Sequence, residues 1–362
     1  MSYVAGMSAE ELRHRFNVER VVKLGSNENP LGPSPAAKQA LLAELDQLNR
    51  YPGTEEEALV EAIAARTGVG AGEVALGNGS VELLVSAVRE LCGGKSSVVI
   101  PRPHFMMYEI AANWCGVPIE WVEARDLAYD LEALAEAACT RGVGLVFLTN
   151  PNNPTGLMVS SDELRDFFAR VPEDVVVVLD EAYGEYATDP RFPDAVRYVR
   201  EGRRVIVTRT FSKIYGLAGL RVGYAIGRAD LVASLKRQQA PFHIGRQALA
   251  AALAAFDDHA FLELSRTTNR DGAAYLATEL ARLGIHTLPT QANHILLTGL
   301  RHVGELDLAL QQRGVIVRPT EPSFGVPDCI RITIGTAEDN RAVVEAFREA
   351  LAAVSAAHPE PV

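Results

Sequence analysis

The feature that most constrains this fold is an alternation of short apolar runs with longer segments of helical periodicity. The runs expected as strands are residues 97–100, 145–149, 175–179, 205–208 and 223–226. Apolar residues at the spacing of one helix face lie between them, for example at Val81, Leu84, Val85, Val88 and Leu91. Strands buried on both faces and separated by helices form a mainly parallel sheet covered by helices, which predicts an α/β fold.

The pattern changes beyond about residue 265. A helix is followed by short strands at 294–297 and 315–317, a strictly alternating strand at 330–334 and a final striped helix. A chain of 362 residues, 48% of them apolar, exceeds one ordinary hydrophobic core. We therefore expect an N-terminal arm and small-domain segment over residues 1–35, a large domain over 36–260 and a small C-terminal α+β domain over 261–362.

The charge and the cysteines exclude several classes of protein. A net charge of -11 disfavours nucleic acid as a partner, and no apolar stretch is long enough to span a membrane. Four scattered cysteines form no CxxC pair, so neither a metal site nor disulfides are expected. With no secretion signal at the N-terminus, a cytoplasmic enzyme is the simplest interpretation.

Polar residues follow the predicted strands at the point where each ends. They are residues 150–156, 180–183, 209–213 with Arg221 beyond, and Gly77 to Ser80 after an apolar run at 74–76. In open α/β sheets, ligands bind beyond the carboxyl ends of the strands. We therefore expect these segments to form one site.

The segment Gly77-Asn-Gly-Ser80 stands directly before a predicted helix. Unpaired backbone N–H groups and the helix dipole favour an anion there, such as a phosphate. A simple glycine-rich turn is the alternative on this signal alone. The dinucleotide pattern GxGxxG fails because its third glycine is missing.

Lys213 is the candidate for covalent chemistry. Thr210 and Ser212 can hydrogen-bond a phosphate, and Arg221 can hold one bidentately. A nearby guanidinium also favours the neutral amine, the only form that makes a Schiff base with an aldehyde. A lysine taken in isolation is usually just solvated.

Asp180 ends a run of valines and a leucine, so its carboxylate is expected to be semi-buried and to need a cationic partner. A protonated pyridine nitrogen would serve, although a helix or turn cap is an equal alternative for this residue alone. Tyr183 and Asn153 could hydrogen-bond a ring oxygen, or be packing and turn residues.

Taken together, the segments resemble the fold-type-I pyridoxal 5′-phosphate (PLP) aminotransferases, most closely the histidinol-phosphate aminotransferases. The resemblance extends over nearly the whole chain. It is carried, in order, by Ser26-Asn-Glu-Asn-Pro30, Tyr51-Pro-Gly53, Gly77-Asn-Gly-Ser80, residues 150–156, Asp180-Glu-Ala-Tyr183, Thr210-Phe-Ser-Lys213, Gly219-Leu-Arg-Val-Gly223 and Ile330-Arg-Ile-Thr-Ile-Gly-Thr336.

The resemblance implies a large PLP-binding domain with a seven-stranded sheet and a role for each motif. Lys213 would hold the cofactor covalently and move the proton at the substrate Cα. Asp180 would pair with the pyridine nitrogen, and Tyr183 and Asn153 would bind the phenolic oxygen. The remaining cofactor contacts would be Gly79, Ser80, Thr210, Ser212 and Arg221 on the phosphate, Phe105 stacked on the ring, and Tyr51 reaching the phosphate of the neighbouring subunit in a homodimer.

For the substrate, the resemblance implies Arg331 as the anion-binding residue, assisted by Arg318, with Asn27 and Tyr3 of the N-terminal arm also in contact. Arg331 could otherwise be the wet face of a strand. The chain departs from the family pattern at Val81, Ala5 and His294, where relatives usually carry Asp, Pro and an aromatic residue. These positions affect the substrate more than the cofactor.

The expected reaction is amino transfer from histidinol phosphate to 2-oxoglutarate. The alternatives are an aromatic amino acid aminotransferase and, with a different reaction, threonine-phosphate decarboxylase. A noncatalytic ligand-binding module is disfavoured because Lys213 is retained and no DNA-binding segment is present. A nicotinamide oxidoreductase would leave Lys213 without a role.

Overall fold

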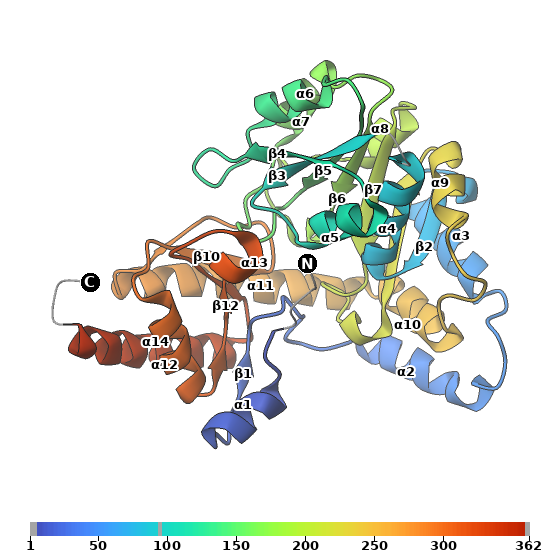
Figure 1. The fold of residues 1–362 in the computed structure, drawn as a ribbon. Helices are drawn as coiled ribbons and strands as arrows, with labels where there is room; N and C mark the ends of the chain where they lie inside the picture. Colours follow the sequence, from blue (N-terminus) through green and yellow to red (C-terminus); the bar gives the residue numbers. More distant parts are fainter. Residues whose placement is uncertain (1–5, 93–95, 359–362) are drawn as a thin grey trace.

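The computed structural model describes residues 6–92 and 96–358, which form a large unit and a smaller one (Figure 1). The large unit contains a seven-stranded sheet. Its strands, in spatial order, are β2 (Val74–Asn78), β8 (Val222–Gly227), β7 (Val205–Thr210), β6 (Val176–Asp180), β5 (Val143–Thr149), β3 (Ser97–Arg102) and β4 (Ile119–Glu123). β8 runs opposite to the other six strands of this sheet. The predicted mainly parallel sheet is confirmed.

Successive residues of the central strands face opposite sides of this sheet. In β5, Leu145 and Phe147 pack into one core, and Val146 and Leu148 pack into the other. The first face is covered by α4 (Gly79–Leu91), α5 (Met107–Cys115) and α9 (Ala229–Lys236). The second face is covered by α3 (Glu55–Thr67), α6 (Leu131–Ala138), α7 (Ser161–Arg170), α8 (Val196–Arg200) and α10 (Arg246–Asp257), with α2 (Pro35–Ala43) packed on α10. Burial on both faces explains the continuous apolar runs.

Two local predictions have different outcomes. Ser160 caps α7 and forms a capping box with Glu163, as its spacing indicates. In α4, however, the fully buried face centres on Leu83, Leu84, Ala87 and Val88, while Val85 is only partly buried. The predicted stripe was offset because this helix packs against the sheet on one side and α5 and α9 on the other, which buries a wider face.

Strand β4 was missed in the sequence. It lies at the edge of the sheet, and Glu120 and Glu123 interrupt its short apolar stretch of Ile119, Trp121 and Val122. An edge strand is wetter than the central strands, so it lacks the apolar run that identified the others.

The smaller unit is built on a four-stranded antiparallel sheet. Its strands, in spatial order, are β12 (Arg318–Pro319), β13 (Ile330–Thr333), β10 (His294–Thr298) and β9 (His286–Thr287). A parallel pair joins β1 (Val22–Lys23) to β11 (Val315–Ile316). The helices of this unit are α1 (Ala9–Phe16), α12 (Val303–Gln312), α13 (Glu321–Phe324) and α14 (Ala337–Ala357). The N-terminal segment therefore packs with the C-terminal part of the chain.

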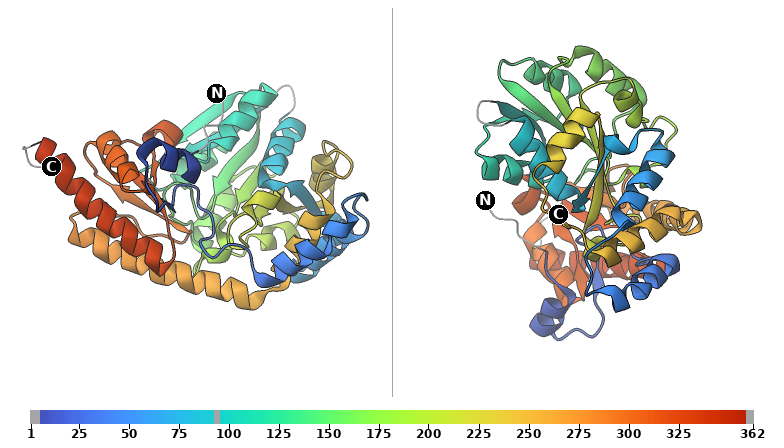
Figure 2. Two further views of the ribbon diagram at one scale, coloured as in Figure 1. Left: turned by 90° about the horizontal axis from the view of Figure 1, so that it is seen from below. Right: turned by 90° about the vertical axis from the view of Figure 1, so that its right-hand side faces the viewer.

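Helix α11 (His259–Arg282) connects the two units and runs along both of them (Figure 2). Leu262 packs into the core of the large unit, and Leu276 and Leu280 pack into that of the smaller unit. The domain limits given above stay a prediction. Among the described helices, none combines the length and the apolar character needed to cross a membrane.

Candidate active site

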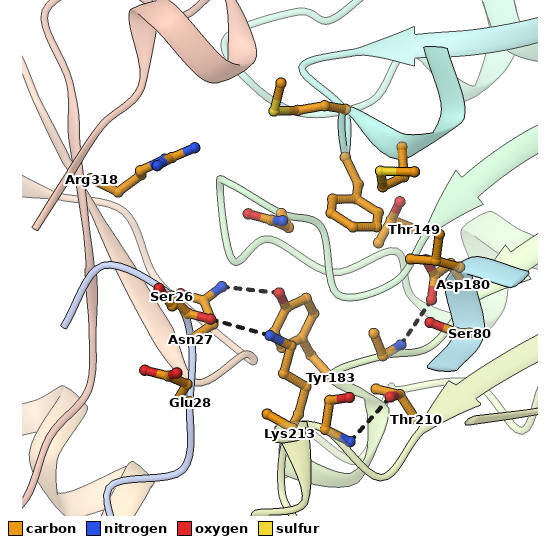
Figure 3. A pocket seen from close by; sticks show the side chains of 18 of the residues that line it. Ser26, Asn27, Glu28, Ser80, Thr149, Asp180, Tyr183, Thr210, Lys213 and Arg318 are labelled. Atoms are coloured by element: carbon orange, nitrogen blue, oxygen red, sulfur yellow. Dashed lines mark hydrogen bonds between the residues drawn. The ribbon is translucent and has the colours of Figure 1, made fainter. Parts of the chain in front are cut away.

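A cavity of about 410 Å³ lies at the carboxyl ends of the central strands, between the two units. The N-terminal segment at residues 25–28 forms one wall, and Arg318 of the small unit faces it from the same side (Figure 3). Arg331 of the small unit also lines the cavity. The predicted site residues that line it are Asn27, Ser80, Phe105, Asn153, Asp180, Tyr183, Thr210, Ser212, Lys213, Arg221, Arg318 and Arg331. The structure thus brings together side chains from segments far apart in the sequence.

One end of the cavity is an anion cradle. Gly79 begins α4 with a φ of 72°, and its N–H donates to the Arg221 carbonyl at 2.8 Å. The side chain of Arg221 lies next to this turn, and its guanidinium donates to Ser212 Oγ at 3.3 Å. Backbone N–H groups at a helix start and a guanidinium are the groups that bind phosphate.

The cradle depends on glycines at two positions. A Cβ at Gly79 would stand 3.1 Å from the Arg221 guanidinium carbon, and one at Gly223 would stand 2.7 Å from the Gly79 carbonyl carbon. Thr210 stabilises the facing loop, because its hydroxyl accepts a hydrogen bond from the Ser212 N–H at 3.1 Å. The residues present therefore fit a phosphate group.

Lys213 lies in the middle of the cavity. Its Nζ donates to the Ser26 carbonyl at 3.3 Å and stands 5.6 Å from the centre of the Tyr183 ring. Burial, together with the nearby Arg331 and Arg221 guanidiniums, lowers the pKa of Lys213 to about 8. Near neutral pH, an appreciable fraction of this amine is therefore unprotonated and able to attack an aldehyde.

Asp180 stands at the end of β6 and is almost completely buried. Burial raises the pKa of its carboxyl group, and hydrogen bonds oppose that change. Tyr108 donates its hydroxyl to Oδ2 at 2.7 Å, and the Ala182 N–H donates to Oδ1 at 3.1 Å. A carboxylate held in this way suits a cationic ring nitrogen.

Tyr108 and Thr149 are two site residues that the sequence analysis missed. Because Tyr108 donates to Asp180, the Thr149 hydroxyl donates to the Tyr108 oxygen, at 2.6 Å. Tyr108 is fully buried on α5 and stacked on Phe147 at 4.3 Å between ring centroids. Tyr108 follows the predicted site residue Phe105 by about one helical turn, and this spacing could have indicated that both lie near the site. Phe105 itself lines the cavity and meets Tyr108 edge-on at 5.7 Å.

Arg331 links the small unit to the cavity wall. It is 5% exposed and donates from Nη1 to Asn153 Oδ1 at 2.6 Å and from Nη2 to the Gly25 carbonyl at 2.7 Å. The alternative of a solvated strand face is therefore wrong. Arg318, on the neighbouring strand, is the register partner of Arg331 and lines the same cavity.

Asn27 and Tyr183 contact each other across the cavity (Figure 3). The amide nitrogen of Asn27, a buried residue, donates to the Tyr183 oxygen at 2.9 Å. Tyr51 does not line the cavity in the single chain. It is 76% exposed and stacks on Phe242 at 4.5 Å. Tyr3 and Ala5 lie outside the described residues.

Comparison with known proteins identifies relatives over nearly the whole chain. The sequence profile of aminotransferase class I and II matches residues 19–347. A histidinol-phosphate aminotransferase of Moorella thermoacetica is 43% identical over 97% of this chain and 90% of its own length.

Solved structures agree with this result. A putative histidinol-phosphate aminotransferase of Erwinia carotovora atroseptica superposes with a TM-score of 0.88 at 29% identity, covering 97% of this chain and 99% of its own. The histidinol-phosphate aminotransferase of Sinorhizobium meliloti, solved in complex with PLP, also gives 0.88, at 26% identity, covering 96% and 95%. The resemblance seen in the sequence is confirmed: the chain belongs to the class I and II aminotransferases.

Proposed function

We propose that this chain is a PLP-dependent aminotransferase that takes the amino group from histidinol phosphate and transfers it to 2-oxoglutarate. The observation that carries the proposal is one cavity containing a lysine of lowered pKa, a buried carboxylate and a glycine-lined anion cradle. The names of the relatives support the choice of amino donor.

Each of these groups would hold one part of the cofactor. Ser80, Thr210, Ser212 and Arg221 would bind the phosphate at the turn that Gly79 opens, and Asp180 would pair with the ring nitrogen. Phe105 would cover the ring face, and Tyr183 and Asn153 would bind the phenolic oxygen. PLP supplies an electron sink for the negative charge that develops at the substrate Cα.

Lys213 is the proposed catalytic base. Its lowered pKa leaves a neutral amine that could accept the proton from the substrate Cα and then donate it to a second atom. Its bond to the Ser26 carbonyl anchors the side chain near the N-terminal wall. The cavity lies between the two units, so residues of both would contact the substrate.

The two arginines favour a phosphate-bearing donor over an aromatic amino acid. Arg318 and Arg331 are direct cross-strand partners in β12 and β13, so their side chains leave the sheet on the same face. Both line the cavity. Two adjacent guanidiniums match the charge of a phosphate dianion, whereas a single carboxylate needs one.

A homodimer with shared active sites is part of the proposal. Exposed apolar side chains precede Tyr51 in the chain, namely Leu42, Leu45 and Leu48, which are 62%, 45% and 57% exposed. Such a patch favours a protein partner. Tyr51 would then extend into the cavity of the neighbouring subunit. The cytoplasmic location stays a prediction.

A donor panel tests the proposed reaction. Purified protein with PLP and 2-oxoglutarate is given histidinol phosphate, phenylalanine or threonine phosphate, and glutamate and CO₂ are measured. We expect glutamate from histidinol phosphate at a rate far above that from phenylalanine, and none from the Lys213→Ala variant. Equal rates with phenylalanine would reject the donor, and CO₂ released without an oxo acid would reject the reaction.

Mixed dimers test the shared site. The variants Lys213→Ala and Tyr51→Ala each damage a different half of the proposed composite site. Mixing them should restore about a quarter of the wild-type sites if both subunits contribute to each cavity. No restoration in a dimer shown to have exchanged subunits would contradict it.

A further inference from the structure

His294 is a buried polar residue that the proposed function does not use. It begins β10 and is 0% exposed. Its imidazole stands edge-on to Tyr183, with 5.0 Å between the ring centroids. Its Nδ1 lies 3.0 Å from Asn27 Nδ2. A polar ring at this depth requires a specific set of partners.

The surroundings fix the protonation of His294. Burial, Arg331 and Lys213 keep the pKa of His294 well below its ordinary value, so the ring is neutral and carries one proton. The Thr333 hydroxyl donates to the Asn27 amide oxygen, so the Asn27 NH2 group is the one that faces Nδ1, and a neutral ring then carries its proton on Nε2, which has no hydrogen-bond partner among the described residues. Nδ1 is therefore the acceptor atom.

An acceptor at Nδ1 in turn fixes the orientation of the Asn27 amide. The amide nitrogen faces His294, and the amide oxygen accepts from the Thr333 hydroxyl at 3.1 Å. The Asn27 N–H also donates to the Thr333 oxygen, at 2.8 Å. A flipped amide would place its oxygen against the unprotonated Nδ1, so two acceptors would face each other without a proton.

The Asn27 amide nitrogen then determines the role of Tyr183. It donates to the Tyr183 oxygen at 2.9 Å, so the Tyr183 hydroxyl must direct its own hydrogen away from Asn27. Tyr183 lines the cavity together with Lys213 and Asp180. In the opposite amide orientation, Tyr183 would donate to Asn27 and would not donate into the cavity.

We infer that His294 is a positioning residue that acts through Asn27 to make Tyr183 a hydrogen-bond donor toward the phenolic oxygen of bound PLP. This inference rests on the proposed function, because it needs PLP in the cavity. A donor on that oxygen reduces its negative charge and weakens its hold on the proton shared with the Lys213 nitrogen. His294 thereby lowers the pH at which the bound cofactor changes its absorbance.

Two substitutions separate this role from packing, because both remove the imidazole ring and only one keeps an acceptor at the position of Nδ1. In His294→Asn, the side-chain oxygen can take the place of Nδ1 as an acceptor, while His294→Leu offers none. The measurement is the midpoint, in pH, of the change in visible absorbance of the PLP-loaded protein. We expect His294→Leu to raise the midpoint pH. The proton concentration at the midpoint should be roughly five- to tenfold lower than in the wild type, which is the effect of one lost hydrogen bond. His294→Asn should stay within roughly twofold of wild type.

A second comparison uses Tyr183→Phe. In that background the hydroxyl is absent, so His294→Leu should produce no further shift. Equal shifts for the Leu and Asn variants, or a full shift that persists with Tyr183→Phe, would overturn the inference. If His294→Leu does not fold, as judged by near-ultraviolet circular dichroism, His294→Phe replaces it in the same comparison. Failure of the wild-type protein to take up PLP in a borohydride-sensitive form would refute the proposed function itself.

Discussion

The close approach of Gly223 to the anion cradle yields a quantitative prediction for Gly223→Ala. The added Cβ would overlap Ser80 N and stand 2.7 Å from the Gly79 carbonyl carbon, while ordinary contact begins at 3.4 Å. Both neighbours are backbone, so the turn itself must move by at least about 0.7 Å, which stretches an amide hydrogen bond from about 2.9 to about 3.6 Å or more. At that distance the bond to a phosphate oxygen is lost.

The expected cost appears in two measurements. A lost hydrogen bond to a charged group weakens PLP binding by about 1.5–3 kcal/mol, or roughly 10- to 150-fold in Kd. Overpacking lowers the free energy of unfolding by about 1–3 kcal/mol. Equilibrium dialysis gives the first value, and urea unfolding of the cofactor-free protein gives the second. Gly219→Ala is the matched control, because a Cβ there meets nothing within 4 Å. Equal PLP affinity of the two variants would refute the assignment of this turn to the phosphate.

Three further predictions concern buried charges. Tyr108→Phe removes the hydroxyl that donates to Asp180 at 2.7 Å, and we expect kcat/KM to fall by roughly 10- to 100-fold with the fold retained; an unchanged kcat/KM would exclude a role for this bond. Lys213 has a folded pKa of about 8 against an ordinary 10.5, so between these pH values the unfolded chain binds more protons and stability rises with pH. Lys213→Met should therefore stabilise the cofactor-free protein below pH 8, by at most about 3 kcal/mol, and the difference should disappear above pH 10.5; a constant difference in unfolding free energy across this range would contradict the sign. Arg209 pairs with the fully buried Glu181 at 2.8 Å, so Arg209→Met should cost about 3–5 kcal/mol in chemical unfolding, and adding Glu181→Gln should recover part of it.

The main features of the fold could be predicted because strands buried on both faces appear in the sequence as continuous apolar runs. The central strands read as apolar runs, since helices cover both of their faces. The ends of β5 and β6 were placed to within one residue because polar residues such as Asp180 end their apolar runs abruptly, whereas β7 continues two residues past the predicted end, to Thr210. Strand β4 was lost for the same physical reason, since an edge strand carries no such run.

The supporting residues of the site could not be predicted, because their roles depend on contacts between distant segments. Tyr108 reaches Asp180 across 72 residues of sequence, and Asn27 reaches Tyr183 across 156. Neither spacing has a local signature. Asn27 was expected to touch the substrate, and that role remains a prediction, but its amide is already bonded to Tyr183 and Thr333.

The electrostatics of the cavity explain why these residues are there. Lys213 and Asp180 have opposite charges in one cavity, yet burial moves the pKa of each toward its neutral form, and their mutual attraction is only a minor contribution. A fold selected for stability alone would pair them directly or replace them with apolar residues, because buried charge is costly. Each instead has backbone or tyrosine partners that hold it apart from the other. A loss of local stability is expected at a site where two groups bind different parts of one ligand. The gain in unfolding free energy expected for Lys213→Met below pH 8 therefore tests this interpretation of the site.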